Sequence, residues 1–322
     1  MHALLPLKKQ IQKIKRFAFF KKKSSLLLIA VFFVILNCIL FLVFLYLIFA
    51  INSQKLAKIP GISENISFSY FKKRPDLLST SKALVIYDAT NKNVLLSKNE
   101  NLRFSPASTA KIMAALVSLE QYADDDVLTY TYQLVNADSS KMGLYVGESM
   151  TFKNLLYGMM LPSGNDAARL LAVNYPGGES AFVKRMNEKA AEIGLKNTQF
   201  VDPAGYADEN YSSGYDLAIL GAYALKNNEL ANVVKTKEMT VVDITGKIPH
   251  KLKNLNELLV IPGVNGIKTG FTNEAEGVLV SAFLHNDTQY IIVVLRSKDR
   301  FSDTRDLISG IIEDLKDESF SF

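Results

Sequence analysis

A continuous run of 26 almost entirely apolar residues, residues 26–51, most constrains how this chain can fold. Asn37 is the only strongly polar residue in the run. A helix of about 20 apolar residues crosses a bilayer, so we expect residues 25–51 to form a transmembrane helix. All eight lysines and arginines of residues 1–51 precede the run, which predicts a basic cytoplasmic tail at residues 1–24 and an extracytoplasmic remainder.

The apolar run is interpreted as an uncleaved signal anchor, because it is too long for a signal-peptide core and no A-x-A cleavage site follows it. Cys38 is the single cysteine, which excludes intrachain disulfide bonds and Cys-rich metal sites. Beyond residue 51 the chain has 29 basic and 32 acidic residues. The net charge of +5 therefore comes from the tail, and the folded part is not expected to bind nucleic acid.

The remainder of the chain divides into a linker and one folded domain. Residues 52–80 mix Pro, Gly and Ser with basic residues, which is typical of a solvated stalk. Residues 81–322 show strand and helix patterns in the order hairpin, helices, strands and helix, which predicts an α+β domain with an antiparallel sheet built from both ends of the chain. The expected elements are strands at 83–87, 94–96, 239–244, 277–284 and 290–295, and helices at 107–121, 151–173 with a break at 161–166, 179–194, 215–226 and 306–315.

Ser108 and Lys111 lie three residues apart at the start of the helix expected over residues 107–121. Residues at this spacing share one face of a helix, so the hydroxyl and the amine should lie close together. A serine hydroxyl becomes a nucleophile when a neighbouring base takes its proton, and a lysine is such a base when burial or a nearby positive charge lowers its pKa. The first helical turn also leaves backbone N–H groups free to stabilise an oxyanion.

The Ser-x-x-Lys spacing alone identifies nothing, because it occurs twice more, at Ser69/Lys72 and Ser79/Lys82. What distinguishes Ser108 is the presence of two further motifs downstream, each of which occurs once in the chain. These motifs are Ser163-Gly164-Asn165 and Lys268-Thr269-Gly270.

Each residue of the last motif has a chemical use beside a serine–lysine pair. We expect Lys268 to supply a fixed positive charge that lowers the pKa of Lys111 and attracts a carboxylate. Thr269 can hydrogen bond that carboxylate, and Gly270 allows a substrate backbone to approach the strand edge.

The middle motif falls in a tight loop between two helical segments. There Ser163 can relay a proton to a departing amine, and Asn165 can hold a substrate amide. A histidine-based triad is not favoured, because His250 is expected in a polar loop and His285 in a hairpin turn, both at the surface.

With these motifs in this order, residues 80–315 resemble the low-molecular-weight penicillin-binding proteins, the serine D-Ala-D-Ala carboxypeptidases. The resemblance implies the penicillin-binding/β-lactamase-like transpeptidase fold, an antiparallel sheet plus a helical cluster, here behind one N-terminal transmembrane helix. Gly164 stands where β-lactamases have Asp, which is similar to the carboxypeptidase branch. The resemblance also includes Pro106–Ser108, Met142–Leu144, Leu161–Ala168 and Gly266–Gly270.

The family implies a reaction on a peptidoglycan stem peptide at the bacterial cell membrane. Ser108 would attack the carbonyl between the two terminal D-alanines, with Lys111 as general base and Ser163 passing the proton to the leaving D-Ala. The backbone N–H groups of Ser108 and Phe271 would form the oxyanion hole. Water would then hydrolyse the acyl-enzyme, β-lactams would trap the same serine, and no metal or cofactor is required.

The same resemblance assigns the binding of the substrate carboxylate to Lys268 and Thr269, aided by an arginine after the next strand. We place this arginine at Arg300, with Arg296 as the competing position. Four departures from the family pattern affect turnover rate and substrate preference more than reaction class. They are Ala110 before the lysine, Leu255 for a usual Thr, the absence of a His after Pro203, and Glu276 for an expected Gly.

Three other functions remain as alternatives to the carboxypeptidase. A D,D-endopeptidase would cut peptide cross-links with the same residues. A β-lactamase would need a glutamate for deacylation, whereas residues 195–205 contain only Asp202 as an acid. A non-catalytic wall-binding scaffold would keep the groove without turnover, and the intact set of Ser108, Lys111 and Lys268 argues against it.

Overall fold

The computed structural model describes residues 66–68, 79–131, 133 and 139–318. The chain divides into two compact units, residues 1–63 and Glu64–Phe322, and all described residues belong to the second. The transmembrane helix expected at residues 25–51 therefore lies outside the described residues. Among the described helices, none has the length and apolar character needed to cross a membrane.

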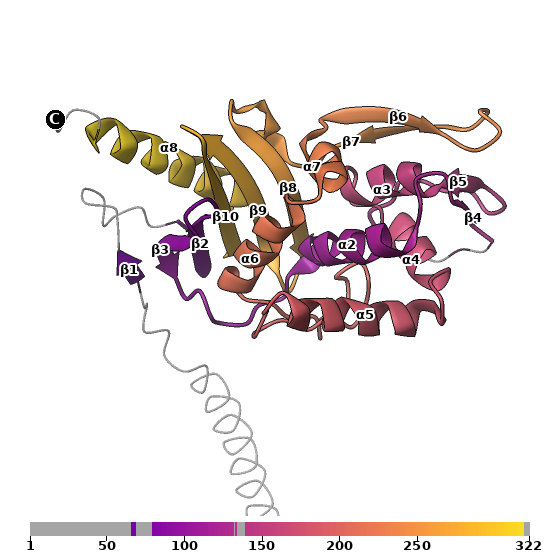
Figure 1. Ribbon diagram of the computed structural model, residues 1–322, viewed down its shortest axis with the longest axis horizontal. Helices are drawn as coiled ribbons and strands as arrows, with labels where there is room; N and C mark the ends of the chain where they lie inside the picture. Colours follow the sequence, from indigo (N-terminus) through magenta and orange to yellow (C-terminus); the bar gives the residue numbers. More distant parts are fainter. Residues whose placement is uncertain (1–65, 69–78, 132, 134–138, 319–322) are drawn as a thin grey trace, which may run out of the picture. The chain divides into compact units, whose positions relative to one another are not determined.

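A six-stranded antiparallel sheet forms the centre of the described unit, with strand order β1-β3-β2-β10-β9-β8 (Figure 1). As expected, the sheet combines strands from both ends of the chain, since β2 pairs with β10 with Ile86 opposite Ile292. The strands are β1 (Ile66–Phe68), β2 (Ala83–Asp88), β3 (Asn93–Lys98), β8 (Val264–Thr272), β9 (Glu276–His285) and β10 (Thr288–Ser297).

The edge strand β1 lies within residues 52–80, the stretch assigned to a solvated linker from its composition. Ile66–Phe68 instead pair with β3, with Ser67 opposite Ser97. The linker prediction is therefore wrong for these three residues, because backbone pairing depends on the free edge of β3 and not on local composition.

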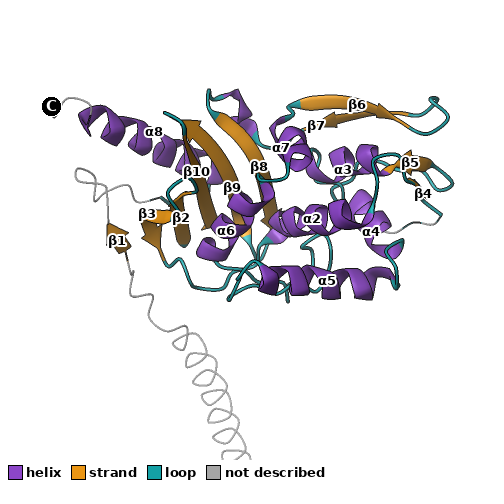
Figure 2. Cartoon of the chain, viewed as in Figure 1, coloured by secondary structure: helices purple, strands orange, loops and turns teal. Residues whose placement is uncertain are grey.

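Helices cover both faces of the sheet (Figure 2). On one face α6 packs against β2, β9 and β10, and Gly221 allows this close approach because a Cβ there would lie 3.0 Å from Ile267 and Val280. On the other face α8 packs against β9 and β10. The helices are α2 (Lys111–Gln121), α3 (Phe152–Met160), α4 (Asn165–Val173), α5 (Gly178–Glu192), α6 (Gly214–Ala224), α7 (Asn228–Lys235) and α8 (Arg300–Glu318).

Two hydrophobic cores result from this layering. The larger core lies between the sheet and the helical cluster and contains Val85, Leu217 and Ile291. The smaller core lies between the sheet and α8 and contains Ile292 and Leu307. Alternate residues of β10 thus enter opposite cores, as the period of a strand requires.

Two small ribbons and two short 3₁₀ helices complete the described unit. β6 pairs with β7 as a hairpin beside α3, and β4 pairs with β5 close to α4. The 3₁₀ helix η1 precedes α2, and η2 precedes β8. These elements are β4 (Val127–Thr129), β5 (Ser149–Thr151), β6 (Glu238–Val242), β7 (Pro249–Lys253), η1 (Ala107–Ala110) and η2 (Glu257–Val260).

Candidate active site

Ser108 and Lys111 meet at the junction of η1 and α2. The Lys111 Nζ donates to Ser108 Oγ at 2.9 Å and to the carbonyl oxygen of Ala204 at 2.8 Å. The contact between hydroxyl and amine that the spacing predicts is therefore present. Ala107, immediately before the serine, has a φ of +45°, a left-handed conformation that is strained for a residue with a side chain.

The amine of Lys111 has the properties of a base at neutral pH. Its side chain is completely buried at the start of α2. Burial lowers the pKa of Lys111 to about 7, although Asp202 and Asp166 oppose part of this effect because their negative charges favour the ammonium. A large fraction of the amine is therefore neutral near pH 7 and can accept the proton of Ser108.

Lys268 lies on β8 and is also fully buried, with its Nζ donating to the carbonyl oxygen of Thr269 at 3.0 Å. Burial lowers the pKa of Lys268 well below its usual value, and the positive charges of Lys111 and Arg300 lower it further. Burial thus opposes the fixed positive charge expected of Lys268, which stays a prediction. Burial, and not Lys268, is also the main cause of the lowered pKa of Lys111.

Arg300 is the arginine that lies beside Thr269. It begins α8, and its Nε donates to Thr269 Oγ1 at 2.5 Å. The competing candidate, Arg296, instead pairs with the Glu276 carboxylate at 3.2 Å. Burial lowers the pKa of Arg300 from its usual value, which marks the side chain as partly desolvated. Arg300 is thus placed beside Thr269 as expected, whereas Arg296 is engaged elsewhere.

Gly270 allows β8 to run directly against the turn that carries the serine. A Cβ at this position would lie 2.9 Å from the backbone nitrogen of Ser108 and 2.9 Å from the Cβ of Ala107. Only glycine fits such an approach without moving the strand. The next residue, Phe271, is largely exposed and lines the adjoining cavity.

Ser163 stands on the loop between α3 and α4, as predicted, whereas Asn165 is the first residue of α4. Ser163 is buried with a φ of +62°, and its hydroxyl has no hydrogen-bond partner among the described residues. The Asn165 backbone N–H donates to the carbonyl oxygen of Ser140 at 2.8 Å, while its buried side-chain oxygen is also without a partner in the described part of the chain. Two polar atoms are therefore available to a ligand.

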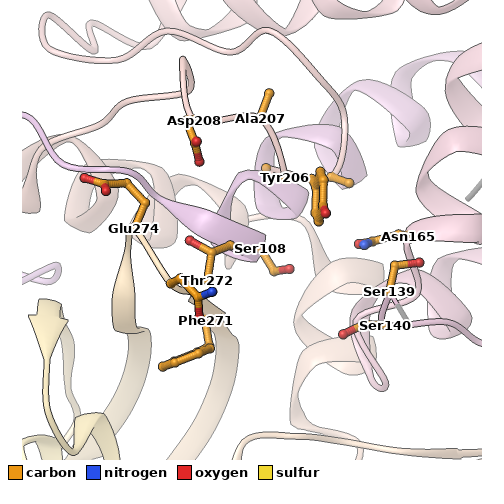
Figure 3. Close-up of a pocket in the computed structure, with 13 residues that line it drawn as sticks. Ser108, Ser139, Ser140, Asn165, Tyr206, Ala207, Asp208, Phe271, Thr272 and Glu274 are labelled. Atoms are coloured by element: carbon orange, nitrogen blue, oxygen red, sulfur yellow. The ribbon is translucent and has the colours of Figure 1, made fainter. Parts of the chain in front are cut away.

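One residue from each of the first two motifs, and Phe271 directly after the third, line one cavity of about 940 Å³. Ser108, Asn165 and Phe271 line it, and Figure 3 shows Ser108 between Phe271 and Thr272 on one side and Asn165 on the other. Segments separated by more than 100 residues thus share a single cleft. Its other lining residues are Ser139, Ser140, Ala204, Gly205, Tyr206, Ala207, Asp208, Asn273 and Glu274.

Sequence reasoning missed the loop that faces the serine. Asp202 accepts hydrogen bonds from the backbone N–H groups of residues 204–207 and from the Asn210 side chain, so one carboxylate holds the whole turn. This turn presents the Ala204 carbonyl to Lys111 and the exposed Tyr206 to the cavity. Asp202-Pro203-Ala204-Gly205 is recognisable turn chemistry, but its location opposite Lys111 depends on tertiary packing.

His250 is placed differently from the expectation. It lies on β7 instead of a polar loop, and its ring is buried against Glu148. Among the described residues, no group of three or more His, Cys, Asp or Glu side chains could hold a metal ion.

Comparison with known proteins agrees with this geometry. The family model described as D-alanyl-D-alanine carboxypeptidase matches residues 71–299. This chain belongs to that family of peptidases. Serine, lysine and the two downstream motifs thus occupy one cleft in a member of a family of hydrolases.

Similar relatives carry both carboxypeptidase and endopeptidase names. DacF, a D-alanyl-D-alanine carboxypeptidase of Bacillus subtilis, is 36% identical over 230 residues, which are 69% of this chain and 59% of that protein. A D-alanyl-D-alanine endopeptidase of Pseudomonas aeruginosa is 34% identical, with 70% of this chain and 74% of that protein covered. This chain thus spans less than two thirds of the length of the Bacillus relative.

A solved structure confirms the expected fold. The Streptomyces K15 DD-transpeptidase superposes with a TM-score of 0.68 at 34% identity, covering 72% of this chain and 97% of that chain. The α+β transpeptidase-like fold, an antiparallel sheet with a helical cluster, is therefore the fold of residues 79–318.

Proposed function

We propose that this protein is a serine D,D-carboxypeptidase that removes the terminal D-Ala of peptidoglycan stem peptides through an acyl-enzyme on Ser108. The observation that carries the proposal is the 2.9 Å contact between Ser108 Oγ and a buried Lys111 Nζ whose pKa is lowered to about 7. The cavity beside this pair is open to an extended peptide, and the family supports D-Ala-D-Ala as the substrate.

The first half of the reaction forms an ester. The neutral Lys111 amine takes the hydroxyl proton of Ser108 while Oγ bonds to the carbonyl carbon between the two D-alanines. Backbone N–H groups of Ser108 and Phe271 stabilise the resulting oxyanion. The C–N bond then breaks, and Ser163 relays the proton that Lys111 accepted to the amine of the departing D-Ala, which becomes the free amino acid and leaves Lys111 neutral.

Binding and the second half of the reaction use the remaining residues. Lys268, Thr269 and Arg300 bind the terminal carboxylate, whose negative charge favours the ammonium form of Lys268 because an anion raises the pKa of a lysine. Gly270 leaves room for the substrate backbone beside β8, and Asn165 holds a substrate amide. Water hydrolyses the ester and regenerates Ser108, and β-lactams trap the same serine as a stable ester.

A D,D-endopeptidase acting on cross-links is the second candidate. The relative in Pseudomonas aeruginosa that supports it is as similar as several of the carboxypeptidases, and a D-alanyl-D-alanine endopeptidase of Escherichia coli is 29% identical. Both reactions would use the same serine and lysine. They differ in whether the leaving group is free D-Ala or an amine on a second stem peptide.

The location that we propose for the enzyme is the bacterial cell membrane. The apolar run at residues 26–51 would cross the bilayer once, with the basic residues before it in the cytoplasm and the catalytic unit outside. This arrangement would keep the cleft on the side of the membrane where peptidoglycan is found.

Labelling with a fluorescent penicillin tests the chemistry directly. The wild-type protein should form a covalent adduct that survives denaturation, and Ser108→Ala should form none. Ser309→Ala, on the exposed side of α8, is the matched control and should label as the wild type does. Absence of labelling in the wild type would favour a wall-binding scaffold without turnover.

Mass spectrometry of muropeptides then separates the two candidate reactions. A carboxypeptidase removes one D-Ala from pentapeptide stems and leaves dimers intact. An endopeptidase converts cross-linked dimers to monomers. Conversion of dimers without release of D-Ala would overturn the carboxypeptidase assignment while preserving the role of Ser108.

A further inference from the structure

A buried contact between a histidine and a glutamate lies outside the residues to which the proposed mechanism gives a role. His250 Nε2 lies 2.6 Å from the Glu148 carboxylate, and both side chains are almost completely inaccessible. His250 belongs to β7, whereas Glu148 immediately precedes β5, so the pair connects the β6–β7 hairpin to a segment 102 residues away. Burial of two such groups is costly unless they serve as partners to each other.

Both nitrogens of the histidine ring face acceptors. Nε2 faces Glu148, and Nδ1 lies 3.3 Å from the carbonyl oxygen of Met142. A neutral ring carries one N–H, so it can donate to only one of these two oxygens. Both contacts are satisfied when the pair holds two protons, as an imidazolium beside a carboxylate does.

The segment held by this pair follows directly on residues that line the cavity. The second Glu148 oxygen accepts from the backbone N–H of Tyr145, and Asp166 accepts from the backbone N–H groups of Met142, Gly143 and Leu144. Residues 142–148 are thus held by α4 on one side and by His250 on the other.

The same segment continues into residues that line the cavity. Ser139 and Ser140 lie in the cavity wall, and the Ser140 carbonyl accepts from the backbone N–H of Asn165 at 2.8 Å. A shift at Met142 would therefore move the wall opposite Ser108. A misplacement of about 1 Å in a substrate-positioning group can reduce a reaction rate about 100-fold.

We infer that His250 and Glu148 are positioning residues that fix the wall of the substrate cleft and loosen it when the ring loses its second proton. This inference rests on the proposed function. Among the described residues, Glu148 is the charged group in contact with the ring, the Tyr145 ring lies 6.3 Å away between centroids, and Val241 opposite it on β6 is apolar. Asp166 on α4 is a further charged group near this segment and accepts from the amides of residues 142–144.

Loss of one ring proton has a definite consequence. The remaining hydrogen stays with the charged Glu148 acceptor, because hydrogen bonds to ionised groups are the stronger ones. Met142 then loses its donor, and the wall segment is released from β7. The wild-type acylation rate should therefore decline at alkaline pH. Deprotonation of Lys111 alone would not cause this decline, because the neutral amine is the active base.

Two variants test whether His250 and Glu148 fix the wall of the cleft. His250→Phe removes both donors and should slow acylation by penicillin by about tenfold, with faster exchange of the backbone hydrogens of residues 142–145. Glu148→Gln keeps the shape of the side chain. A neutral His250 ring can then accept a hydrogen bond from the Gln amide at Nε2 and donate its Nδ1–H to the Met142 carbonyl. This variant should lose the alkaline decline. His285→Gln, a histidine at the far end of β9, is the matched control and should behave as wild type.

The readouts are acylation rates between about pH 5 and 9, hydrogen exchange, and ¹⁵N NMR of the histidine rings. The inference requires two protonated nitrogens on the His250 ring at the pH of fastest acylation. A single protonated nitrogen there, or a wild-type rate in His250→Phe, would overturn the inference. If the wild type fails to react with penicillin, the proposed function fails instead, and the NMR and exchange measurements still decide the state of the pair. If His250→Phe does not fold, the Glu148→Gln profile decides.

Discussion

At the scale of single residues, the chemistry of the cleft depends on a buried amine. Lys111 makes two hydrogen bonds, to Ser108 and to Ala204, and has no contact with water. Desolvation disfavours its charged form and lowers its pKa to about 7. The lysine thereby becomes a base without help from a histidine.

The expected result is an acylation rate that rises with pH through about 7. Below that value the amine is protonated and cannot accept the Ser108 proton, so the rate should fall about tenfold for each further pH unit. Stopped-flow labelling with a fluorescent penicillin across this range measures it. Lys111→Arg should be inactive at every pH, because arginine stays protonated. A rate that is flat from pH 5 to about 8 would exclude Lys111 as the base.

Local spacing in the sequence predicts the contacts and burial of some of these residues well and those of others poorly. The Ser108–Lys111 contact follows from helix geometry within one turn, so the sequence suffices to predict it. The charge of Lys268 and the burial of His250 depend on segments more than 100 residues away, which no local pattern encodes. Arg300 was placed by family resemblance, and its contact with Thr269 agrees with that placement.

At the scale of elements, the turn at residues 202–210 supports the serine–lysine pair. Its backbone folds around the Asp202 carboxylate, which accepts five donors, and the turn delivers the Ala204 carbonyl to Lys111. Asp202 also raises the pKa of Lys111, although less than burial lowers it. The turn therefore affects both the position and the basicity of the amine.

Asp202→Asn separates these two effects. Removing the negative charge should lower the pKa of Lys111 further, so the midpoint of the acylation profile should move to lower pH. The amide cannot accept all of the donors that face the carboxylate, so the fold should lose about 1–3 kcal/mol of stability. Urea unfolding and the pH profile of penicillin labelling measure the two effects.

Glu209→Gln, an exposed change of the same charge in the same turn, is the control for Asp202→Asn and should alter neither quantity. A midpoint that stays in place, or moves to higher pH, would show that Asp202 does not act on the amine through its charge.

Most regular elements were predictable because they are long and periodic. The core strands and α5 and α6 fall within two or three residues of the expected ranges. Short elements were missed: β4 and β5 have three residues each, and their pairing depends on a partner about 20 residues away. α8 begins at Arg300, six residues earlier than its apolar pattern indicated, because its first turn is polar and faces the site.

At the scale of the whole molecule, the central sheet joins strands from near both ends of the described unit. β2 and β10, near opposite ends of the chain, are direct neighbours in the sheet, and both hydrophobic cores lie within the described residues. Three residues before position 79 also contribute a strand, since β1 pairs with β3. We therefore propose a boundary of the folded unit before β1, between residues 63 and 64, in place of the predicted start at residue 81.

A chain restricted to residues 64–322 tests this boundary and the anchor together. It keeps β1 and both cores, so it should unfold in one cooperative transition and react with penicillin at the rate of the detergent-solubilised full chain. Without the apolar run it should remain in the supernatant when membranes are sedimented, whereas the full chain should sediment with them.

A further shortened chain, residues 79–322, exposes the β3 edge and should be less stable in urea by about 1–2 kcal/mol, because the cross-strand pairs with β1 are lost. Membrane association of the 64–322 chain would contradict the anchor proposal, and equal stability of the two shortened chains would show that β1 contributes nothing to the fold.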